Sequence, residues 1–148
     1  MRPRIVVLVG LPGSGKSTWA EREGDGVGVL SSDAIRGLLS DDPANQTIHA
    51  RTFTVLRYLL RHRLDLHRPV TYIDATNLTP YERRPYMTFA NLYDCGIEAV
   101  FFDVSIEECQ RRNRERHRVV PDQAIAEMAR RLVPPSTAEG FNRVIVVA

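Results

Sequence analysis

Lysine is almost missing from this chain of 148 residues, because Lys16 is the only one and every other Lys or Arg position holds arginine. Arginine has a broad planar head, whereas lysine ends in a compact point charge on a flexible stem. A chain that uses arginine everywhere else therefore indicates that position 16 requires the smaller cation.

Cysteines and long apolar runs are also scarce. The two cysteines, Cys95 and Cys109, are too few for a disulfide framework, so we expect free thiols in a reducing compartment. The apolar run Ile5–Val9 is too short for a signal peptide, and no window approaches the length of a membrane span. These absences predict a cytoplasmic protein with no membrane partner.

The charge balance is close to neutral. The chain has 20 Lys and Arg residues against 18 Asp and Glu residues, which leaves a formal net charge of +2. No overall positive field therefore marks a nucleic-acid binder, and such a partner must be gripped by a local patch. The length suits one compact domain, so we expect residues 1–148 to form a single domain.

Short apolar runs alternate with helical patterns along the chain. The runs that read as strands are residues 4–10, 27–32, 70–75, 97–104 and 141–147. The helical patterns between them begin near residues 16, 32, 47, 80, 105 and 121. This alternation predicts an α/β fold with a parallel five-stranded sheet and helices on both faces.

Two helices carry further local signals. Pro85 falls inside the fourth helical pattern, and we expect it either in the first turn or at a break in the helix. Ser105 can cap the fifth helix, and Glu108 follows it at capping-box spacing. Residues 134–141 are expected to form a loop.

A phosphate-binding pattern follows the first strand. Residues 10–17 read GLPGSGKS, which fits G-x-x-x-x-G-K-S between a strand and a helix. The glycines let backbone N–H groups turn toward phosphate oxygens, and Lys16 can follow the β- and γ-phosphates while Ser17 ligates Mg²⁺. The motif predicts a P-loop NTPase/kinase fold with the sheet order 2-3-1-4-5. The residues expected to hold ATP are Gly13, Ser14, Gly15, Lys16, Ser17 and Thr18.

Polar residues also follow the second and third strands. Asp33 opens a helix at the carboxyl edge of the sheet, where it can accept the proton of an attacking hydroxyl. Arg36 lies one turn further on the same face and can hold a phosphate. The alternative is a capping aspartate beside a solvated arginine. Asp74 ends the third strand, where it can hold a metal-bound water or orient the phosphate loop, unless it and Asn77 only form an Asx turn.

The fifth helical pattern is crowded with arginines. These are Arg111, Arg112, Arg114, Arg116 and Arg118. A run like this is usually a solvated face, but the acids Glu107, Glu108 and Glu115 are too few to neutralise it. Beside a P-loop, the run predicts a lid over about residues 111–121 that closes on the triphosphate and stabilises charge as the γ-phosphoryl group moves.

Four segments together resemble the 5′-hydroxyl polynucleotide kinases in order and spacing. They are GLPGSGKSTWA, SSDAIRGLLSDD, IDATNLTPYERRPYMTFA and FFDVSIEECQRRNRER. The resemblance covers nearly the whole chain and is strongest to the kinase domain of the bacterial RNA-repair end-healing enzyme. It is also clear to the kinase domain of the phage polynucleotide kinase. It implies transfer of the ATP γ-phosphate to a 5′-OH end of RNA or DNA in the presence of Mg²⁺.

The resemblance implies a role for each matching position. Lys16 and Ser17 match the phosphate-binding lysine and the metal-site serine. Asp33 matches the general base, and Arg36 matches the arginine that engages the acceptor or the transferred phosphate. Asp74 matches a functionally important aspartate. The positions that match ATP-contacting lid arginines are Arg112, Arg116 and Arg118.

The acceptor stays open at this stage. The repair enzymes carry a phosphatase and, in bacteria, a ligase beside the kinase, so a repair role implies such partners. Related P-loop proteins phosphorylate antibiotics or nucleotide sugars, which makes a small-molecule phosphotransferase the first alternative. The second alternative is an ATP-binding regulatory module with no acceptor, and it leaves the placement of Asp33 unexplained.

Overall fold

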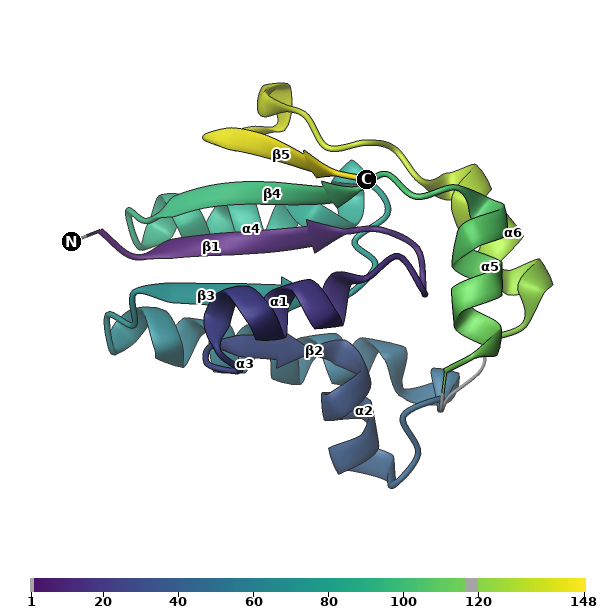
Figure 1. Cartoon of the computed structure of the whole chain (residues 1–148). Coiled ribbons are helices and arrows are strands. Elements are labelled where there is room, and N and C mark those ends of the chain that lie inside the picture. The colour runs from purple at the N-terminus through teal and green to yellow at the C-terminus, as the bar shows by residue number, and fades with distance from the viewer. Residues whose placement is uncertain (1, 117–119) are drawn as a thin grey trace.

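The structure is a computed structural model that describes residues 2–116 and 120–148. Its centre is a sheet of five strands: β1 (Arg4–Val9), β2 (Val29–Ser31), β3 (Val70–Asp74), β4 (Gly96–Phe102) and β5 (Arg143–Val147). The strands lie in the order β2-β3-β1-β4-β5, and every pairing is parallel. The predicted α/β class and the predicted strand order are both confirmed (Figure 1).

Helices cover both faces of the sheet, as predicted. They are α1 (Lys16–Gly24), α2 (Ser32–Ser40), α3 (His49–Asp65), α4 (Pro80–Leu92), α5 (Ile106–Arg114) and α6 (Asp122–Arg131). Short 3₁₀ turns, η1 (Gln46–Ile48) and η2 (Thr137–Glu139), precede α3 and interrupt the expected loop before β5. α1 packs on one face, and α3 and α4 pack on the other (Figure 1). Across the described ranges, no helix combines the length and apolar content that a membrane crossing needs.

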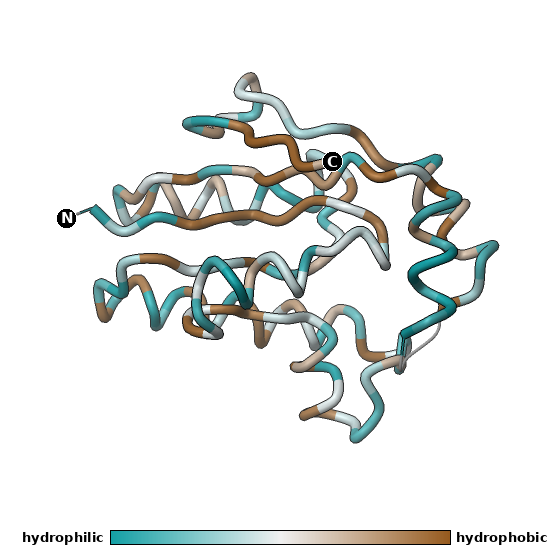
Figure 2. The backbone as a smooth tube through the Cα atoms, viewed as in Figure 1, coloured by the Kyte–Doolittle hydropathy of each residue, from teal (hydrophilic) through white to brown (hydrophobic). Residues whose placement is uncertain are grey.

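The side chains of β1 divide the core into two layers. Ile5, Val7 and Val9 pack in the layer that α3 and α4 cover, whereas Val6 and Leu8 pack in the layer that α1 covers. All five are at most 1% exposed, which explains why this strand reads as an unbroken apolar run. Burying each such side chain contributes about 1.5–3 kcal/mol. In Figure 2 the tube along β1 is predominantly hydrophobic after its first residue.

The proline inside α4 is accommodated within the helix. Pro85 lies in the second turn, neither in the first turn nor at a break, so that prediction was wrong. A proline here removes the N–H that the carbonyl of Tyr81 would accept. Tyr81 is 76% exposed, so water can reach this part of the helix. Thr79 and Glu82 form a capping box that holds the first turn in place ahead of the proline.

A buried ion pair fixes the loop between β3 and α4. Arg83 is fully buried and makes a two-pronged contact with Glu139, at 2.9 and 2.8 Å. Its Nη1 also donates to the carbonyl oxygen of Asn77 at 2.7 Å. Asn77 in turn donates from its side-chain amide to the carbonyl of Leu8 at 2.7 Å. These contacts join the ends of β1 and β3 to α4 and η2 at the carboxyl edge of the sheet.

Candidate active site

The polar ends of the strands meet at the carboxyl edge, where open α/β sheets bind ligands. A cleft of about 590 Å³ opens there, between the β1–α1 loop, the start of α2 and the helices α5 and α6. The parallel register pairs Ser31 with Asp74, so β2 and β3 end side by side. The predicted residues that line the cleft are Gly13, Gly15, Lys16, Ser17, Thr18, Asp33, Arg36, Asp74, Arg112 and Arg116.

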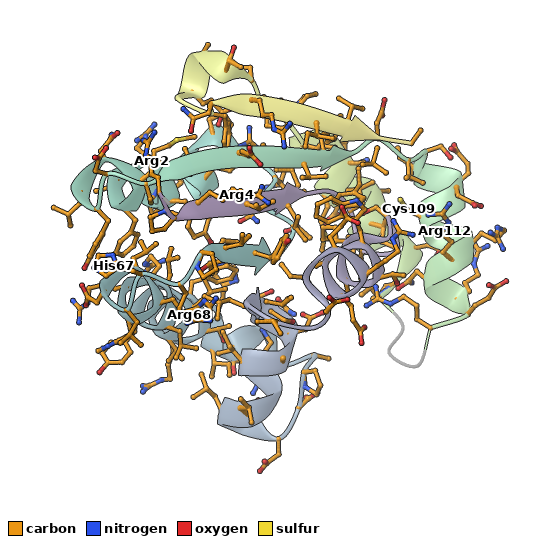
Figure 3. The ribbon with its side chains drawn as sticks, turned by 60° about the vertical axis from the view of Figure 1, so that its left-hand side comes forward. Arg2, Arg4, His67, Arg68, Cys109 and Arg112 are labelled. Carbon is orange, nitrogen blue, oxygen red and sulfur yellow. The ribbon has the colours of Figure 1, made fainter. Side chains whose placement is uncertain are left out.

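The phosphate-binding loop depends on two glycines with left-handed backbone angles. Gly15 has a φ of 100° and caps α1, which begins at Lys16, and Gly13 has a φ of 84°. A Cβ on Gly13 would lie 2.5 Å from the carbonyl oxygen of Cys109 on α5, so this glycine is also required by a close approach. Figure 3 shows Cys109 and Arg112 on α5. The loop is therefore packed directly against the backbone of the arginine-rich helix.

The side chain of Lys16 is buried against the phosphate-binding loop. Its side chain is 8% exposed, and Nζ donates to the carbonyls of Gly10 at 3.0 Å and Leu11 at 2.9 Å. The pKa of Lys16 is lowered to about 8, chiefly by burial and in part by the positive charge of Arg116, whereas the Asp74 carboxylate opposes the shift. A buried ammonium with neutral carbonyl partners is well suited to take an anion, because a phosphate would restore its charged form.

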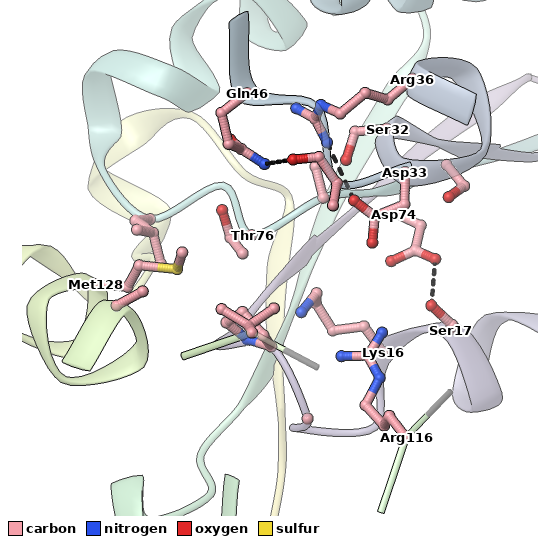
Figure 4. Close-up of a pocket in the computed structure, with 18 of the residues that line it drawn as sticks. Lys16, Ser17, Ser32, Asp33, Arg36, Gln46, Asp74, Thr76, Arg116 and Met128 are labelled. Carbon is pink, nitrogen blue, oxygen red and sulfur yellow. Dashed lines mark hydrogen bonds and ion pairs between the residues drawn. The ribbon is translucent and has the colours of Figure 1, made fainter. Parts of the chain in front are cut away.

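Ser17 and Asp74 place two oxygens together beside Lys16 (Figure 4). The Ser17 hydroxyl donates to Oδ2 of Asp74 at 2.7 Å, and Asp74 is 6% exposed at the end of β3. No cluster of three or more His, Cys, Asp or Glu side chains in the described part of the chain could cage a metal. Mg²⁺ binds through few protein oxygens and completes its shell with phosphates and water. The donor set therefore fits a magnesium ion that arrives with a nucleotide.

Asp33 and Arg36 form the opposite wall of the cleft. Arg36 Nη1 lies 3.1 Å from Oδ1 of Asp33, and Arg36 is 4% exposed although Asp33 is accessible. Ser31 caps α2, accepting a hydrogen bond from the N–H of Ala34 at 3.1 Å, so the capping role proposed as the alternative for Asp33 belongs to Ser31. The buried Nε of Arg36 has no hydrogen-bond partner within the described ranges. This guanidinium keeps a donor available for another acceptor.

Two arginines of the predicted lid reach the cleft. Arg112 and Arg116 both line it, on the side opposite α2. Nε of Arg112 lies 3.1 Å from Oε2 of Glu108, and the Nη1 atom of Arg112 would lie 3.9 Å from a Cβ placed on Gly15. Ser105 caps α5 by accepting from the N–H of Glu108 at 3.1 Å, as predicted. The carboxylate of Glu108 pairs with arginines and does not complete a capping box.

The remaining described arginines of the run point to acidic partners. Arg111 pairs with Glu108 at 2.6 Å and with Glu115 at 3.2 Å. The hydrogen bond from Arg111 is the largest cause that lowers the pKa of Glu108, to about 2. Arg114 pairs with Asp122, 2.5 Å away at the start of α6. Asp122 adds an acidic partner that the sequence of the run does not contain, because this residue lies in the next helix. Among the described arginines of the run, Arg112 and Arg116 are the ones that line the cleft.

One predicted residue, Ser14, is described but does not line the cleft. Ser14 is 4% exposed, and its backbone N–H donates to the carbonyl of Leu11 at 3.1 Å within the loop. Its hydroxyl has no hydrogen-bond partner among the residues described. A Cβ on Gly10 would lie 2.6 Å from this hydroxyl, so Ser14 fills space under the loop. Arg118 lies outside the described residues.

Several lining residues were not predicted. They are Gln46, His49, Phe53, Thr76, Glu82, Met128 and Arg131, among others. His49 and Phe53 are four residues apart on the first turns of α3, and their rings lie 4.7 Å apart. The only sequence signal for them is this helical spacing, which equally suits a core face. Gln46 and Thr76 lie away from Lys16 and Arg116 in Figure 4, so the cleft extends well beyond the phosphate loop.

Comparison with known proteins points to P-loop kinases. The family described as the AAA domain matches residues 5–135. The L-seryl-tRNA(Sec) kinase of Methanococcus maripaludis is 26% identical over 146 residues, which cover 93% of this chain and 56% of that protein. This chain therefore spans little more than half the length of that curated relative.

Solved structures give the same fold. A chain of the Pnkp1/Rnl/Hen1 RNA repair complex is 25% identical with a TM-score of 0.69, covering 88% of this chain and 44% of its own. A gluconokinase from Sinorhizobium meliloti 1021 is 21% identical with a TM-score of 0.67, covering 98% of this chain and 82% of its own. The second likeness concerns the fold alone. A chain of an RNA repair complex and a gluconokinase thus share this fold.

Proposed function

We propose that this chain, which belongs to the AAA domain family, is an ATP-dependent kinase that phosphorylates the 5′-hydroxyl end of RNA or DNA. One observation carries the proposal. The carboxylate of Asp33 and the buried guanidinium of Arg36 share a cleft with Lys16, Ser17 and Asp74. A nucleotide-binding switch has no need of an acidic group opposite its phosphate loop, whereas a kinase does.

The nucleotide would lie on the side of the cleft formed by the P-loop and α5. Backbone N–H groups at the start of α1 and the Lys16 ammonium would bind its phosphates. Ser17 and Asp74 would hold Mg²⁺, which neutralises charge on the β- and γ-phosphates. Arg112 and Arg116 would close over the triphosphate as part of a lid. We place this lid at about residues 111–121, with Arg118 as its third ATP-contacting arginine.

Asp33 would act as the general base. Its carboxylate accepts the proton of the acceptor hydroxyl while the oxygen–phosphorus bond forms. At the same time the bond from the γ-phosphorus to the β,γ-bridging oxygen breaks, and ADP leaves. Lys16, Arg36 and Arg116 would stabilise the charge on the phosphoryl oxygens during transfer.

The relatives support a hydroxyl carried by RNA. One takes part in an RNA repair complex, and the other is a kinase of seryl-tRNA(Sec), and their identities to this chain are 25% and 26%. A repair role would require phosphatase and ligase activities from partner proteins. The second candidate is a small-molecule kinase. The net charge of only +2 favours it, because no broad positive field is present to attract a polynucleotide.

End-labelling tests the proposal directly. The protein is incubated with ATP, Mg²⁺ and single-stranded RNA or DNA bearing a 5′-OH or, as a control, a 5′-phosphate. Labelling of the 5′-OH strands alone, and its loss in Asp33→Ala, is the expected result. Labelling of a small hydroxyl compound but of no oligonucleotide would establish the second candidate. Slow ATP hydrolysis with transfer to no hydroxyl would reject both in favour of a regulatory module.

A further inference from the structure

A second groove opens beside the cleft, between α3 and α4. It encloses about 600 Å³. The residues that line both the groove and the cleft are His49, Phe53, Thr76 and Glu82. The cleft and the groove therefore adjoin at the end of the cleft away from the phosphate loop.

Aromatic and cationic side chains line the groove. Tyr81 is 76% exposed, and Cζ of Arg84 lies 5.6 Å from the centre of its ring. Arg57, on the facing helix α3, also lines the groove. Within residues 2–116 and 120–148, neither Arg57 nor Arg84 forms an ion pair. Exposed aromatic faces beside unpaired arginines are the features by which proteins bind single-stranded nucleic acid without reading its sequence.

The acidic residue of the groove is already engaged. Glu82 accepts from the N–H of Thr79 at 3.0 Å in the capping box and pairs with Arg131 at 3.1 Å. Its charge is therefore balanced by a cation from α6 and by the positive end of α4. The groove as a whole favours an anionic ligand with flat apolar faces.

We infer that this α3–α4 groove binds the second and third nucleotides of a single-stranded acceptor, an inference that rests on the proposed function. The triphosphate takes the end of the cleft at Lys16, and the reacting hydroxyl lies at Asp33. The rest of the acceptor strand then leaves past His49 and Phe53 into the groove. A base stacks on the face of Tyr81 and Arg84, and Arg57 binds the phosphate that links the nucleotides.

The inference predicts that acceptor length matters. A nucleoside 3′-phosphate ends inside the cleft and makes no use of the groove, whereas a strand of about ten nucleotides extends through it. The kinetic experiment measures KM for both acceptors with wild type, Tyr81→Ala and Arg84→Gln. We expect KM for the long strand to rise about tenfold or more in each variant, with KM for the short acceptor unchanged.

A matched pair on α3 provides the control. Tyr58 is 54% exposed, and Cζ of Arg61 lies 5.5 Å from its ring, but neither residue lines the cleft or the groove. Tyr58→Ala and Arg61→Gln therefore remove the same chemistry from another surface. We expect both to leave KM for both acceptors unchanged. An equal rise for the two acceptors in Tyr81→Ala would mean a damaged cleft and would overturn the groove assignment.

Direct binding separates this inference from the proposed function. Fluorescence anisotropy of a labelled single strand of about ten nucleotides measures Kd without any turnover. If the wild type binds the strand and Tyr81→Ala weakens binding about tenfold, the groove assignment stands even when no end is labelled. If the strand fails to bind, or binds Tyr81→Ala and Tyr58→Ala equally well, the assignment is wrong. The proposed function is then decided by end-labelling alone.

Discussion

The guanidinium of Arg36 lies 3.1 Å from the carboxylate of Asp33, and it is almost fully buried while its partner faces the cleft. The pair is held one helical turn apart at the start of α2. Because the arginine is fixed by burial, the orientation of the carboxylate toward the cleft is restricted in advance. This is the arrangement expected of a base that must meet a hydroxyl in one geometry.

Removing the carboxylate should stop transfer and spare nucleotide binding. Asp33→Asn keeps the size of the side chain but cannot take a proton at neutral pH, so we expect kcat to fall by about 10²–10⁴. The affinity for ATP, measured by calorimetry, should change less than about threefold. Asp41→Asn, at the exposed end of the same helix, is the control and should keep full activity. Undiminished labelling by Asp33→Asn would rule out this residue as the base.

Replacement of the single lysine by arginine should abolish activity. Lys16 donates to two carbonyls inside a closed loop, where a guanidinium is too broad to fit. Lys16→Arg should therefore abolish phosphoryl transfer and the rise in melting temperature that ATP produces, with the circular dichroism spectrum unchanged. Arg22→Lys makes the reverse exchange on the exposed side of α1 and should be silent. Near-normal activity in Lys16→Arg would contradict this account.

Nucleotide affinity should weaken above neutral pH. The pKa of Lys16 is lowered to about 8 by burial, so the ammonium that binds phosphate is lost as the pH rises through that value. We expect Kd for ATP to rise toward about tenfold per pH unit above pH 8, and Lys16→Met to show no such dependence. The stability of the fold should change in the opposite direction and increase with pH. The unfolded chain keeps this proton up to its ordinary pKa of 10.5, so the free energy of unfolding rises across that window.

Substitutions at Gly13 and Gly26 separate the effect of backbone strain from the effect of a steric clash in the phosphate loop. Gly13→Ala places a Cβ 2.5 Å from the Cys109 carbonyl, whereas Gly26→Ala, at a similar positive φ, meets nothing within 4 Å. Gly26→Ala should cost about 1 kcal/mol of unfolding free energy and leave Kd for ATP unchanged. Gly13→Ala should add a rise in Kd of about tenfold or more, because the loop or α5 must move. Equal effects of the two substitutions on Kd would refute the close-packing argument.

The buried ion pair should prove structural. Arg83→Met removes a fully buried guanidinium and leaves the partly buried Glu139 carboxylate without its partner, so we expect a loss of about 3–5 kcal/mol in urea unfolding. Adding Glu139→Gln should cost less than the sum of the two single changes. Arg143→Met removes an exposed arginine from Glu98, which keeps its ion pair with Arg4, and should cost about 1 kcal/mol or less. Strict additivity at Arg83 and Glu139 would show that the two residues are not coupled.

The sequence predicted features that depend on near neighbours in the chain. The spacing from Gly10 to Ser17 determines the loop geometry by itself, and the apolar runs determine the sheet, so both were correctly anticipated. The edge position of Asp33 and Asp74 followed from strand polarity alone. The parallel register that pairs Ser31 with Asp74 then brings them into one cleft.

Features built from distant segments could not be predicted. Arg83 and Glu139 are 56 positions apart, and their pairing requires α4 and η2 to meet behind the sheet. The groove depends on the gap left between α3 and α4, and nothing in either helix alone specifies that gap. The error at Pro85 has a local cause, because a missing N–H near an exposed helix start costs less than one in a buried turn.

Because Lys16 is the only lysine, its chemical modification can measure how much of the protein has nucleotide bound. An amine-directed acylating reagent has one ε-amino target in the whole chain. The lowered pKa of that target supplies free amine close to neutral pH. A bound triphosphate would both cover Nζ and return it to the unreactive ammonium form. The modified fraction of a single peptide, read by mass spectrometry, then reports how much of the protein carries nucleotide.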